Sequence, residues 1–333
     1  MTEAIQVEKI DRFFAGTLDT HGVAKNAADA VRNALVNASL LGIDSHGVNL
    51  FEHYIQCVIE GRVNKETNIS FSNDGGFITC DANHNFSHYA ALELLKVMDD
   101  ATSSQAISIG RIVNSDHIGA VGIHAFNSKI QNKLIFGFTN ADALANTPDG
   151  KSVVFGTNPI SCVMNERDQL LYIDLATTKY SMNKIKNYRR SKTRLPIKIA
   201  RDENMELTTD ADAARTIEPI GGHKGFALAF LVEVMTSGLS GQAHSADLLS
   251  MYYTDLTVRR NVSHSFIMVN PEFLGLGGVE NIWKVVQATR DRLETDQEKL
   301  SPGRKELQTR RARMVDGIPV QPEILSGWSK MGF

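Results

Sequence analysis

The first sixty residues alternate apolar and polar side chains with the spacing of amphipathic helices. Apolar residues recur every three or four positions over 7–18, so that they line one face of a helix. The same spacing returns over 31–38. Gly42 follows where that second helix would end, because glycine tolerates the left-handed conformation of a helix C-cap. The region up to about Gly61 is therefore predicted to be helical.

The middle of the chain changes to short apolar runs punctuated by Gly, Asn and Asp, a pattern typical of buried strands. The predicted strands are 76–80, 106–110, 134–138, 153–155, 170–173 and 265–269, and helices are predicted over 89–101 and 226–235. The second of these helices is apolar on every side, which predicts that it is central and covered. From about Glu280 the chain becomes charged and helical. The alternation of strands and helices indicates an α/β protein.

Length and overall charge narrow the class of protein. With 333 residues the chain is longer than a typical single domain, so one large or two interleaved domains are expected. A net charge of −3 argues against a nucleic-acid partner, because phosphate binding requires an excess of Lys and Arg. The basic stretch 179–201 is local, and we interpret it as a solvated loop.

Cysteine usage and hydropathy favour a cytoplasmic protein with no membrane partner. Three scattered cysteines, none in a CxxC pair, predict neither a disulfide framework nor a structural zinc site, and no metal is expected. The N-terminal residues interleave charged with apolar side chains, unlike a secretion signal. The chain has no run of about 18 apolar residues, so no transmembrane helix is predicted.

A histidine framed by glycines is the first candidate for chemistry. Ser45 and His46 lie in the segment 42–47, directly after a predicted helix. An imidazole in a cleft exchanges a proton near neutral pH, and a neighbouring hydroxyl can hydrogen-bond the substrate or relay that proton. The alternative is a capped turn with a surface histidine, which the spacing alone favours.

Two glycine-rich segments are candidates for phosphate binding. Residues 114–122, which include His117, follow a predicted strand, where ligands bind in α/β proteins. Glycines that serve packing in an ordinary turn explain this segment equally well. Residues 219–225 precede the apolar helix, and the free amides there would form an anion site together with Lys224. A solvated lysine on a glycine-rich loop is the alternative, and it fits less well with a buried helix.

A dinucleotide-binding fingerprint of the Rossmann type is missing. Residues 275–280 begin like one, but Glu280 occupies the place of the last glycine and no full strand-helix-strand unit precedes it. An ordinary Rossmann enzyme is therefore not indicated.

The order of these segments resembles the malate/L-lactate dehydrogenase family, whose members lack a Rossmann fold. That family includes ureidoglycolate dehydrogenase, 2,3-diketo-L-gulonate reductase and Δ1-piperideine-2-carboxylate reductase. The resemblance covers essentially the whole chain, and its segments are specific when taken together. They are LGIDSHG (41–47), VNSDHIGAVG (113–122), TNADA (139–143), FGTNPISC (155–162), IDLATT (173–178), PIGGHKGFALAFLVEVMTSGLSG (219–241), NVSHSFIMVNPEFLG (261–275) and SPGRKE (301–306).

The resemblance implies a fold, a cofactor and an assembly. The implied fold is α/β, a non-Rossmann, malate/L-lactate dehydrogenase-like NAD(P)-binding fold with helical N-terminal and C-terminal segments. The cofactor would be NAD or NADP, and the assembly an intertwined homodimer. Residues 76–279 would form the NAD(P)-binding α/β domain. Residues 1–75 and 280–333 would form a mainly helical region for substrate binding and dimerisation.

The resemblance also implies roles for individual residues. His46 would donate the proton to the carbonyl oxygen during reduction, with Ser45 in its relay and Lys184 adding positive charge. His117 is the alternative acid/base, and we keep both histidines while preferring His46. The implied substrate contacts are His46, Asn49 and His53. The implied cofactor-binding residues are His117, Ile118, Gly119, Ala120, Gly156, Thr157, Asn158, Pro159, Asp174, Leu175, Ala176, His223, Lys224, Ser301, Pro302, Gly303 and Arg304.

The chain departs from the family pattern on the substrate side. Family members commonly have an arginine at the place of Leu50, where it would grip the substrate carboxylate as a bidentate clamp, and His53 replaces a second frequent arginine. Our hypothesis is that Asn49, His53 or a basic residue near Arg189 and Arg190 compensates. Further departures are Ser87, Ala141, Asn183 and Arg304. An arginine at position 304 has two interpretations, a partner of the NADPH 2′-phosphate or a surface substitution.

The predicted activity is hydride transfer between a nicotinamide and a small 2-oxo acid or its 2-hydroxy acid. Lys184 stands where dehydrogenases of the family usually have lysine and the cyclic-imine reductases have aspartate, which weighs against an imino acid. Reduction of a cyclic imino acid or a sugar-derived keto acid is the alternative reaction. A diverged cofactor-binding relative without activity is the alternative outside enzymes.

Overall fold

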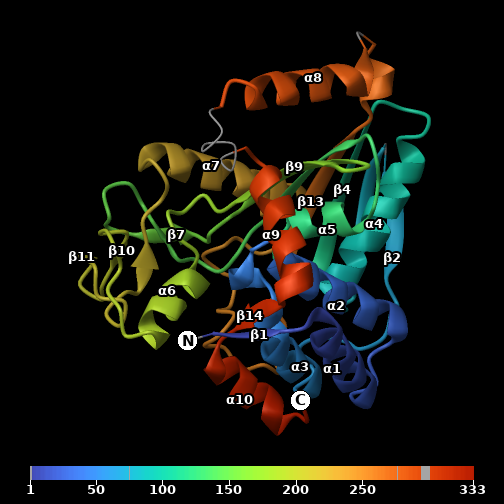
Figure 1. Cartoon of the computed structure of the whole chain (residues 1–333). Helices are drawn as coiled ribbons and strands as arrows, with labels where there is room; N and C mark the ends of the chain where they lie inside the picture. The colour runs from blue at the N-terminus through green and yellow to red at the C-terminus, as the bar shows by residue number, and fades with distance from the viewer. Residues whose placement is uncertain (1, 75, 276, 294–300) are drawn as a thin grey trace.

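Strands and helices alternate along the chain and assemble into three sheets with covering helices (Figure 1). This computed structural model describes residues 2–74, 76–275, 277–293 and 301–333. The predicted α/β class is confirmed, and so are the helical segments at both ends of the chain.

The central sheet contains the predicted apolar strands and brings distant segments together. Its order is β2-β3-β4-β13-β5-β8-β9; β3 and β4 run parallel and the other neighbours are antiparallel. β13 comes late in the chain but lies between β4 and β5, so the end of β4 is held inside the sheet. The bounds are β2 (Ser70–Asp74), β3 (Phe77–Asp81), β4 (Ile107–Ser115), β5 (Leu134–Thr139), β8 (Ile160–Glu166), β9 (Gln169–Leu175) and β13 (Val262–Val269).

Helices α2 (Lys25–Leu40), α4 (Ser87–Ala101) and α5 (Gly122–Asn127) pack together beside this sheet (Figure 1). α4 turns Leu94, Leu95 and Met98 inward at helical spacing, and these side chains share a core with Ile112 and Phe266 of the sheet. The predicted end of α2 is confirmed, because Gly42 follows it with a φ of +84°.

The two ends of the chain form one helical layer (Figure 1). α1 (Val7–Thr20), α2, α3 (Phe51–Ile59) and α10 (Pro322–Lys330) share a core, and β1 (Glu3–Ile5) pairs with β14 (Ile318–Val320). The rings of Phe14 and Phe51 stack with centroids 3.6 Å apart, and Trp328 meets Phe14 edge-on at 5.3 Å. Aromatic burial therefore joins the C-terminal segment to the N-terminal helices.

The remaining helices lie on the sheet side. α8 (Gly278–Arg290) lies across one end of the sheet, where Trp283 and Val279 pack on Met164. α9 (Arg304–Asp316) contacts both α2 and β9, so it links the helical layer to the outer strand of the sheet.

The basic stretch 179–201 is not a solvated loop, and that interpretation was wrong. It contains α6 (Met182–Arg190), and Ile185, Leu195 and Ile199 are buried in a small core of their own. The few apolar residues are widely spaced among basic ones, which hid the helix from the hydrophobic pattern. α6 lies beside a five-stranded sheet of β6 (Ala145–Asn146), β7 (Val153–Phe155), β10 (Ala200–Arg201), β11 (Leu207–Thr208) and β12 (Thr216–Ile217).

The apolar helix is present as α7 (His223–Glu233), but it is not covered on every side. Ala229 and Val232 are buried, whereas Phe230 and Leu231 are 56% and 47% exposed, and Val234 in the following π-helical turn is 46% exposed. The prediction of a fully covered helix was therefore wrong for this face. An all-apolar pattern does not distinguish the inside of one chain from a surface for a partner.

Candidate active site

The turn that carries Ser45 and His46 is held tightly at the end of α2. Residues Asp44–His46 form one turn of 3-10 helix, and Gly47 packs so closely on Ser39 that no Cβ would fit. Arg313 donates to both carboxylate oxygens of Asp44, one at 2.9 Å. The Ser45 hydroxyl lies 2.9 Å from His46 Nδ1, so it fixes one edge of the imidazole ring.

His117 follows β4 and is held by a buried ion cluster. Its backbone N–H donates to Asp116 Oδ1 at 2.6 Å, and Arg260 donates to the same oxygen at 3.2 Å. Arg260 also donates to Asp142 at 2.6 Å, which ties this turn to the segment after β5. Removing one member of such a cluster would leave a buried charge unpaired.

The two predicted histidines, far apart in the sequence, face each other in the fold. The rings of His46 and His117 have centroids 5.8 Å apart and an interplanar angle of 23°. The Tyr54 hydroxyl lies 2.6 Å from His117 Nδ1. Burial lowers the pKa of His46 to about 4 and that of His117 well below its ordinary value, and it raises the pKa of Tyr54. At neutral pH both imidazoles are therefore neutral and Tyr54 keeps its proton.

His46 lines a cavity of about 420 Å³ together with many of the predicted residues. Lys184, at the start of α6, is on the same wall, and its Nζ lies 3.9 Å from the centroid of the Tyr180 ring. The predicted residues that line this cavity are Ser45, His46, Gly119, Ala120, Thr157, Pro159, Asp174, Leu175, Ala176 and Lys184.

Asp174, at the end of β9, is a buried carboxyl group of this cavity. It accepts the Gly122 amide at 2.8 Å and the Tyr172 hydroxyl at 3.3 Å. Burial raises the pKa of Asp174 to about 6, against the opposing effect of these two hydrogen bonds. The carboxyl group is therefore ionised at neutral pH and protonated in mild acid.

Other predicted cofactor residues turn away from the cavity. The Asn158 amide donates to Glu233 at 3.0 Å and is fully buried, and Ile118 is buried in the main core. Gly156 packs against the backbone of Ala141 with no room for a Cβ. These residues shape the wall from behind.

Two further predicted segments, the anion-binding candidate 219–225 and the implied cofactor-binding residues 301–304, are absent from the lining of the His46 cavity except for Ile220. His223 and Lys224 are the exposed first residues of α7, just after Ile220, which lines it. The other segment consists of Ser301, Pro302, Gly303 and Arg304. It lies beside Leu170, which is in the same strand as Asp174 but nearer the start of β9. Arg304 lines a separate cavity of about 240 Å³ there.

A second cavity, of about 250 Å³, shares the lining residue Ser45 with the first. Asn49, Leu50 and His53 line it, as does Asn183. The hypothesis of a compensating basic residue near Arg189 and Arg190 had named the neighbourhood of Arg190, but sequence reasoning missed two other lining residues, Lys186 and Tyr252. The spacing of Lys186 and Arg190, four residues apart on one helix, was the available signal. The sequence analysis missed Tyr54 as well, because the one signal at this residue is its place in an apolar run.

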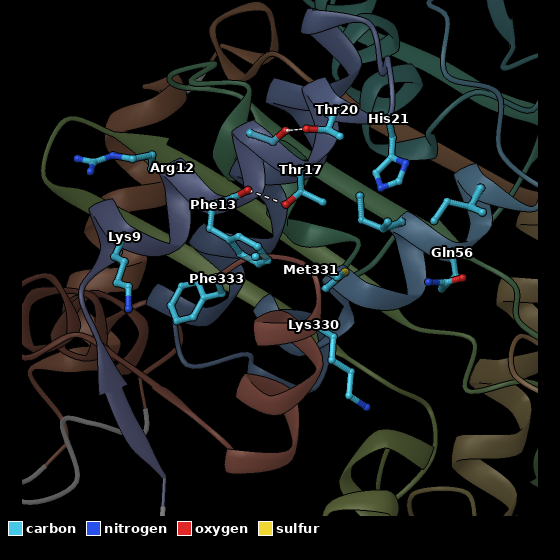
Figure 2. Close-up of a pocket in the computed structure, with 14 residues that line it drawn as sticks. Lys9, Arg12, Phe13, Thr17, Thr20, His21, Gln56, Lys330, Met331 and Phe333 are labelled. Atoms are coloured by element: carbon cyan, nitrogen blue, oxygen red, sulfur yellow. Dashed lines mark hydrogen bonds between the residues drawn. The ribbon is translucent and has the colours of Figure 1, made fainter.

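A larger cavity, of about 730 Å³, lies between α1, α3 and α10, away from His46. Figure 2 shows Lys9 and Lys330 at its edge and the rings of Phe13 and Phe333 inside it. The hydroxyls of Thr17 and Thr20 donate to carbonyls of their own helix, at 2.9 and 2.8 Å. Since these polar groups do not converge on the space, volume alone does not make it the reactive site.

The described residues hold no group of three or more His, Cys, Asp or Glu side chains arranged to bind a metal ion. Among them, no helix combines the length and the apolar character needed to cross a bilayer.

Known proteins resemble this chain over nearly its whole length. A family model described as malate/L-lactate dehydrogenase matches residues 5–327. Malate dehydrogenase of Pyrococcus abyssi is 24% identical over 342 residues, which covers 96% of this chain and 92% of that protein. The (2R)-3-sulfolactate dehydrogenase (NADP(+)) of Chromohalobacter salexigens is 27% identical over 294 residues, covering 86% and 87%. A dehydrogenase structure from Sinorhizobium meliloti has a TM-score of 0.92 at 22% identity, covers 99% of this chain and 98% of that chain, and shares its fold.

Proposed function

The chain belongs to the malate/L-lactate dehydrogenase family, and from this premise we propose that it interconverts a small 2-oxo acid and its 2-hydroxy acid with a nicotinamide cofactor. The names of its relatives support this reaction, since malate and sulfolactate are both 2-hydroxy acids. The observation that carries the proposal is the facing pair His46 and His117, of which His46 lines a cavity together with Lys184.

The residues of the His46 cavity fit a nicotinamide cofactor. A volume of about 420 Å³ is in the range of small-molecule sites. Gly119 has a φ of +74° at the turn after β4, which leaves backbone without a side chain at the wall. The nicotinamide half would be held by Thr157, Pro159, Asp174 and Ala176. The other half of the cofactor would be held by the segment 301–304, beside the start of β9. When bound, the cofactor supplies or accepts the hydride.

His46 is proposed as the proton-transferring group. Because its pKa is about 4, its imidazole is neutral at pH 7 and ready to accept the proton of a substrate hydroxyl during oxidation. Ser45, 2.9 Å from Nδ1, orients the ring and offers a path for that proton. In reduction the ring would take up a proton by way of Ser45 and deliver a proton to the carbonyl oxygen, and Lys184 would stabilise negative charge there.

His117 is the alternative acid/base, and Tyr54 distinguishes its setting. With Tyr54 protonated, we assign its hydroxyl as the donor to Nδ1, and in that tautomer Nε2 of the neutral ring carries the N–H. We therefore propose that His117 hydrogen-bonds the substrate and that His46 moves the proton.

A homodimer is proposed as the assembly. The exposed apolar side chains of Phe230, Leu231 and Val234 lie together on one face of α7 and the turn after it, and burial by a second copy would remove them from water. Their exposure in a single chain supports this assembly.

The test follows the absorbance of NADH and NADPH with a panel of small 2-oxo acids, sugar-derived keto acids and cyclic imino acids, for the wild type and His46→Ala. The proposal expects turnover with 2-oxo acids that collapses in the variant. Turnover confined to cyclic imino acids would contradict it. Cofactor binding without turnover on any compound would favour a relative that has lost activity.

A further inference from the structure

The cavity beside His53 has a basic wall that the proton chemistry at His46 does not use. Lys186 and Arg190 lie one helical turn apart on α6 and both line this cavity. Asn49, just before α3, and His53, in the first turn of α3, line the same cavity. Ser45 lines this cavity and the His46 cavity alike, so the two cavities share the residue next to His46.

The charge on this wall is not neutralised by the carboxylates around it. Among the described residues, Asp44 and Glu52 are the acidic groups that line the cavity. Asp44 is paired with Arg313 at 2.9 Å, and Glu52 is an exposed residue at the first turn of α3. The cavity therefore keeps a surplus of positive charge.

The two basic groups have weak or non-ionic contacts within the chain. Lys186 Nζ lies 2.8 Å from the centroid of the Tyr252 ring, a cation–π contact. Arg190 donates to the side-chain oxygens of Asn187 and Gln321 over 3.4 and 3.5 Å, long distances for hydrogen bonds. Both groups therefore have donors to offer an anion.

A hydrogen-bonded chain fixes α6 relative to the reactive turn. The Tyr252 hydroxyl donates to Asn183 Oδ1 at 2.7 Å, and the Asn183 amide donates to the Ser45 carbonyl at 2.8 Å. The ring that contacts Lys186 is thus linked through Asn183 to the residue before His46. The basic wall and the imidazole are held in one frame.

We propose that Lys186 and Arg190 form the anion subsite of the enzyme and hold an oxyanion of the substrate while its C2 lies at His46. The oxyanion is the C1 carboxylate or a second acidic group on the substrate. This inference rests on the proposed function. It gives the substrate class as organic acids whose oxyanion is bound by residues of α6. Arg189 is excluded, because its guanidinium donates to the carbonyls of Ala211 and Ala214, each at 2.8 Å.

The subsite is tested with the double variant Lys186→Gln/Arg190→Gln and the control Lys198→Gln, an exposed lysine that lines neither cavity. Steady-state kinetics are measured with pyruvate, a monoanion, and with oxaloacetate and 3-sulfopyruvate, which are dianions. KM is expected to rise about ten- to hundredfold in the double variant while kcat stays within about threefold, since charge-assisted hydrogen bonds are lost. An effect on all three acids assigns the C1 carboxylate, and an effect on the dianions alone assigns the second acidic group. Unchanged KM values for all three acids would overturn the subsite.

A binding experiment separates the subsite from the reaction. Malonate, which is not reduced, is titrated by calorimetry into each variant in the presence of NADH and of NADPH. Binding to the wild type that is lost in the double variant and kept in Lys198→Gln supports the subsite even if no 2-oxo acid turns over. Turnover of 2-oxo acids together with unchanged KM and malonate affinity would leave the proposed function standing and overturn the subsite.

Discussion

The two cavities that Ser45 lines differ in whether their lining residues lie in the family segments. The His46 cavity is lined by turns that carry the family segments, 41–47, 113–122, 155–162 and 173–178. The other cavity is lined by Leu50, His53 and Asn183, where the chain departs from the family pattern, and by Lys186 and Arg190 of α6. Under the roles proposed above, the reacting groups and the groups that select the substrate occupy separate walls, so one can change while the other stays.

The largest expected effect comes from breaking the reactive side. His46→Gln should lower kcat by about 10²- to 10⁴-fold, the usual range for a general acid/base, because glutamine cannot exchange the proton. The Kd for NADH or NADPH, measured by fluorescence, should change little. His21→Gln, at the larger cavity of Figure 2, is the control and should keep full activity. A His46→Gln enzyme with normal kcat would move the acid/base role to His117.

The second prediction changes the selecting side. Leu50→Arg should raise kcat/KM for pyruvate by about ten- to hundredfold, because a guanidinium at this position reaches the cavity of Lys186 and can pair with a carboxylate. Leu50 is only 5% exposed, so a thermal melt must show that the variant folds, with Leu50→Met as the matched control. A folded variant with unchanged pyruvate kinetics would count against a carboxylate at this wall.

The third prediction concerns cofactor binding. With a pKa of about 6, Asp174 is ionised above that pH, so affinity that depends on its carboxylate should weaken as pH falls from 7 to 5. Asp174→Asn should bind the cofactor about tenfold more weakly at pH 7 and lose this pH dependence. Asp100→Asn, at the far end of α4, is the control for fluorescence titrations. Identical pH profiles in all three proteins would remove Asp174 from the cofactor site.

The smallest expected effect is a pH dependence of substrate binding. Burial, with Arg190 and Arg189 nearby, lowers the pKa of Lys186 to about 8, while Asp142 opposes this shift. Lys186 is cationic below that pH and neutral above it, so KM for a 2-oxo acid should rise between about twofold and tenfold from pH 7 to pH 9.

Variants distinguish Lys186 from the other groups around that cavity. Those groups are Arg189, Arg190, Asp142, Asp44, Glu52, His53 and Tyr252. Burial holds the pKa of His53 at about 4 and that of Tyr252 at about 12, so neither changes charge between pH 7 and 9. Lys186→Arg should abolish the rise in KM, because arginine keeps its charge. A rise that persists in this variant would assign the titration to another group.

Periodicity predicted those elements whose buried face dominates their sequence. Helix α1 and the strands β5 and β13 bury a regular set of apolar side chains, so the pattern along the chain was sufficient. α6 was missed because Ile185 is its one buried residue among several basic ones. α7 was misjudged because Phe230 and Leu231 look like core residues yet are exposed in a single chain.

The candidate site was only partly accessible from the sequence. Resemblance singled out His46 and His117, but the 5.8 Å between their rings depends on tertiary packing of two turns that lie far apart in the chain. For the basic wall, the sequence hypothesis named the neighbourhood of Arg190 but not Lys186. Lys186 and Tyr252 lie far apart in the chain, and their meeting depends on how α6 packs on the turn Asp44–His46 through Asn183.

The most direct test of the account follows the hydride itself. NADH or NADPH labelled with deuterium at C4, on one face and then on the other, is supplied with the 2-oxo acid that turns over best, and the product is analysed by mass spectrometry. The account predicts a 2-hydroxy acid with one deuterium at C2 from one of the two faces, and a strongly reduced yield with His46→Gln. A product without deuterium, whichever face of the cofactor was labelled, would contradict hydride transfer to a substrate held at His46.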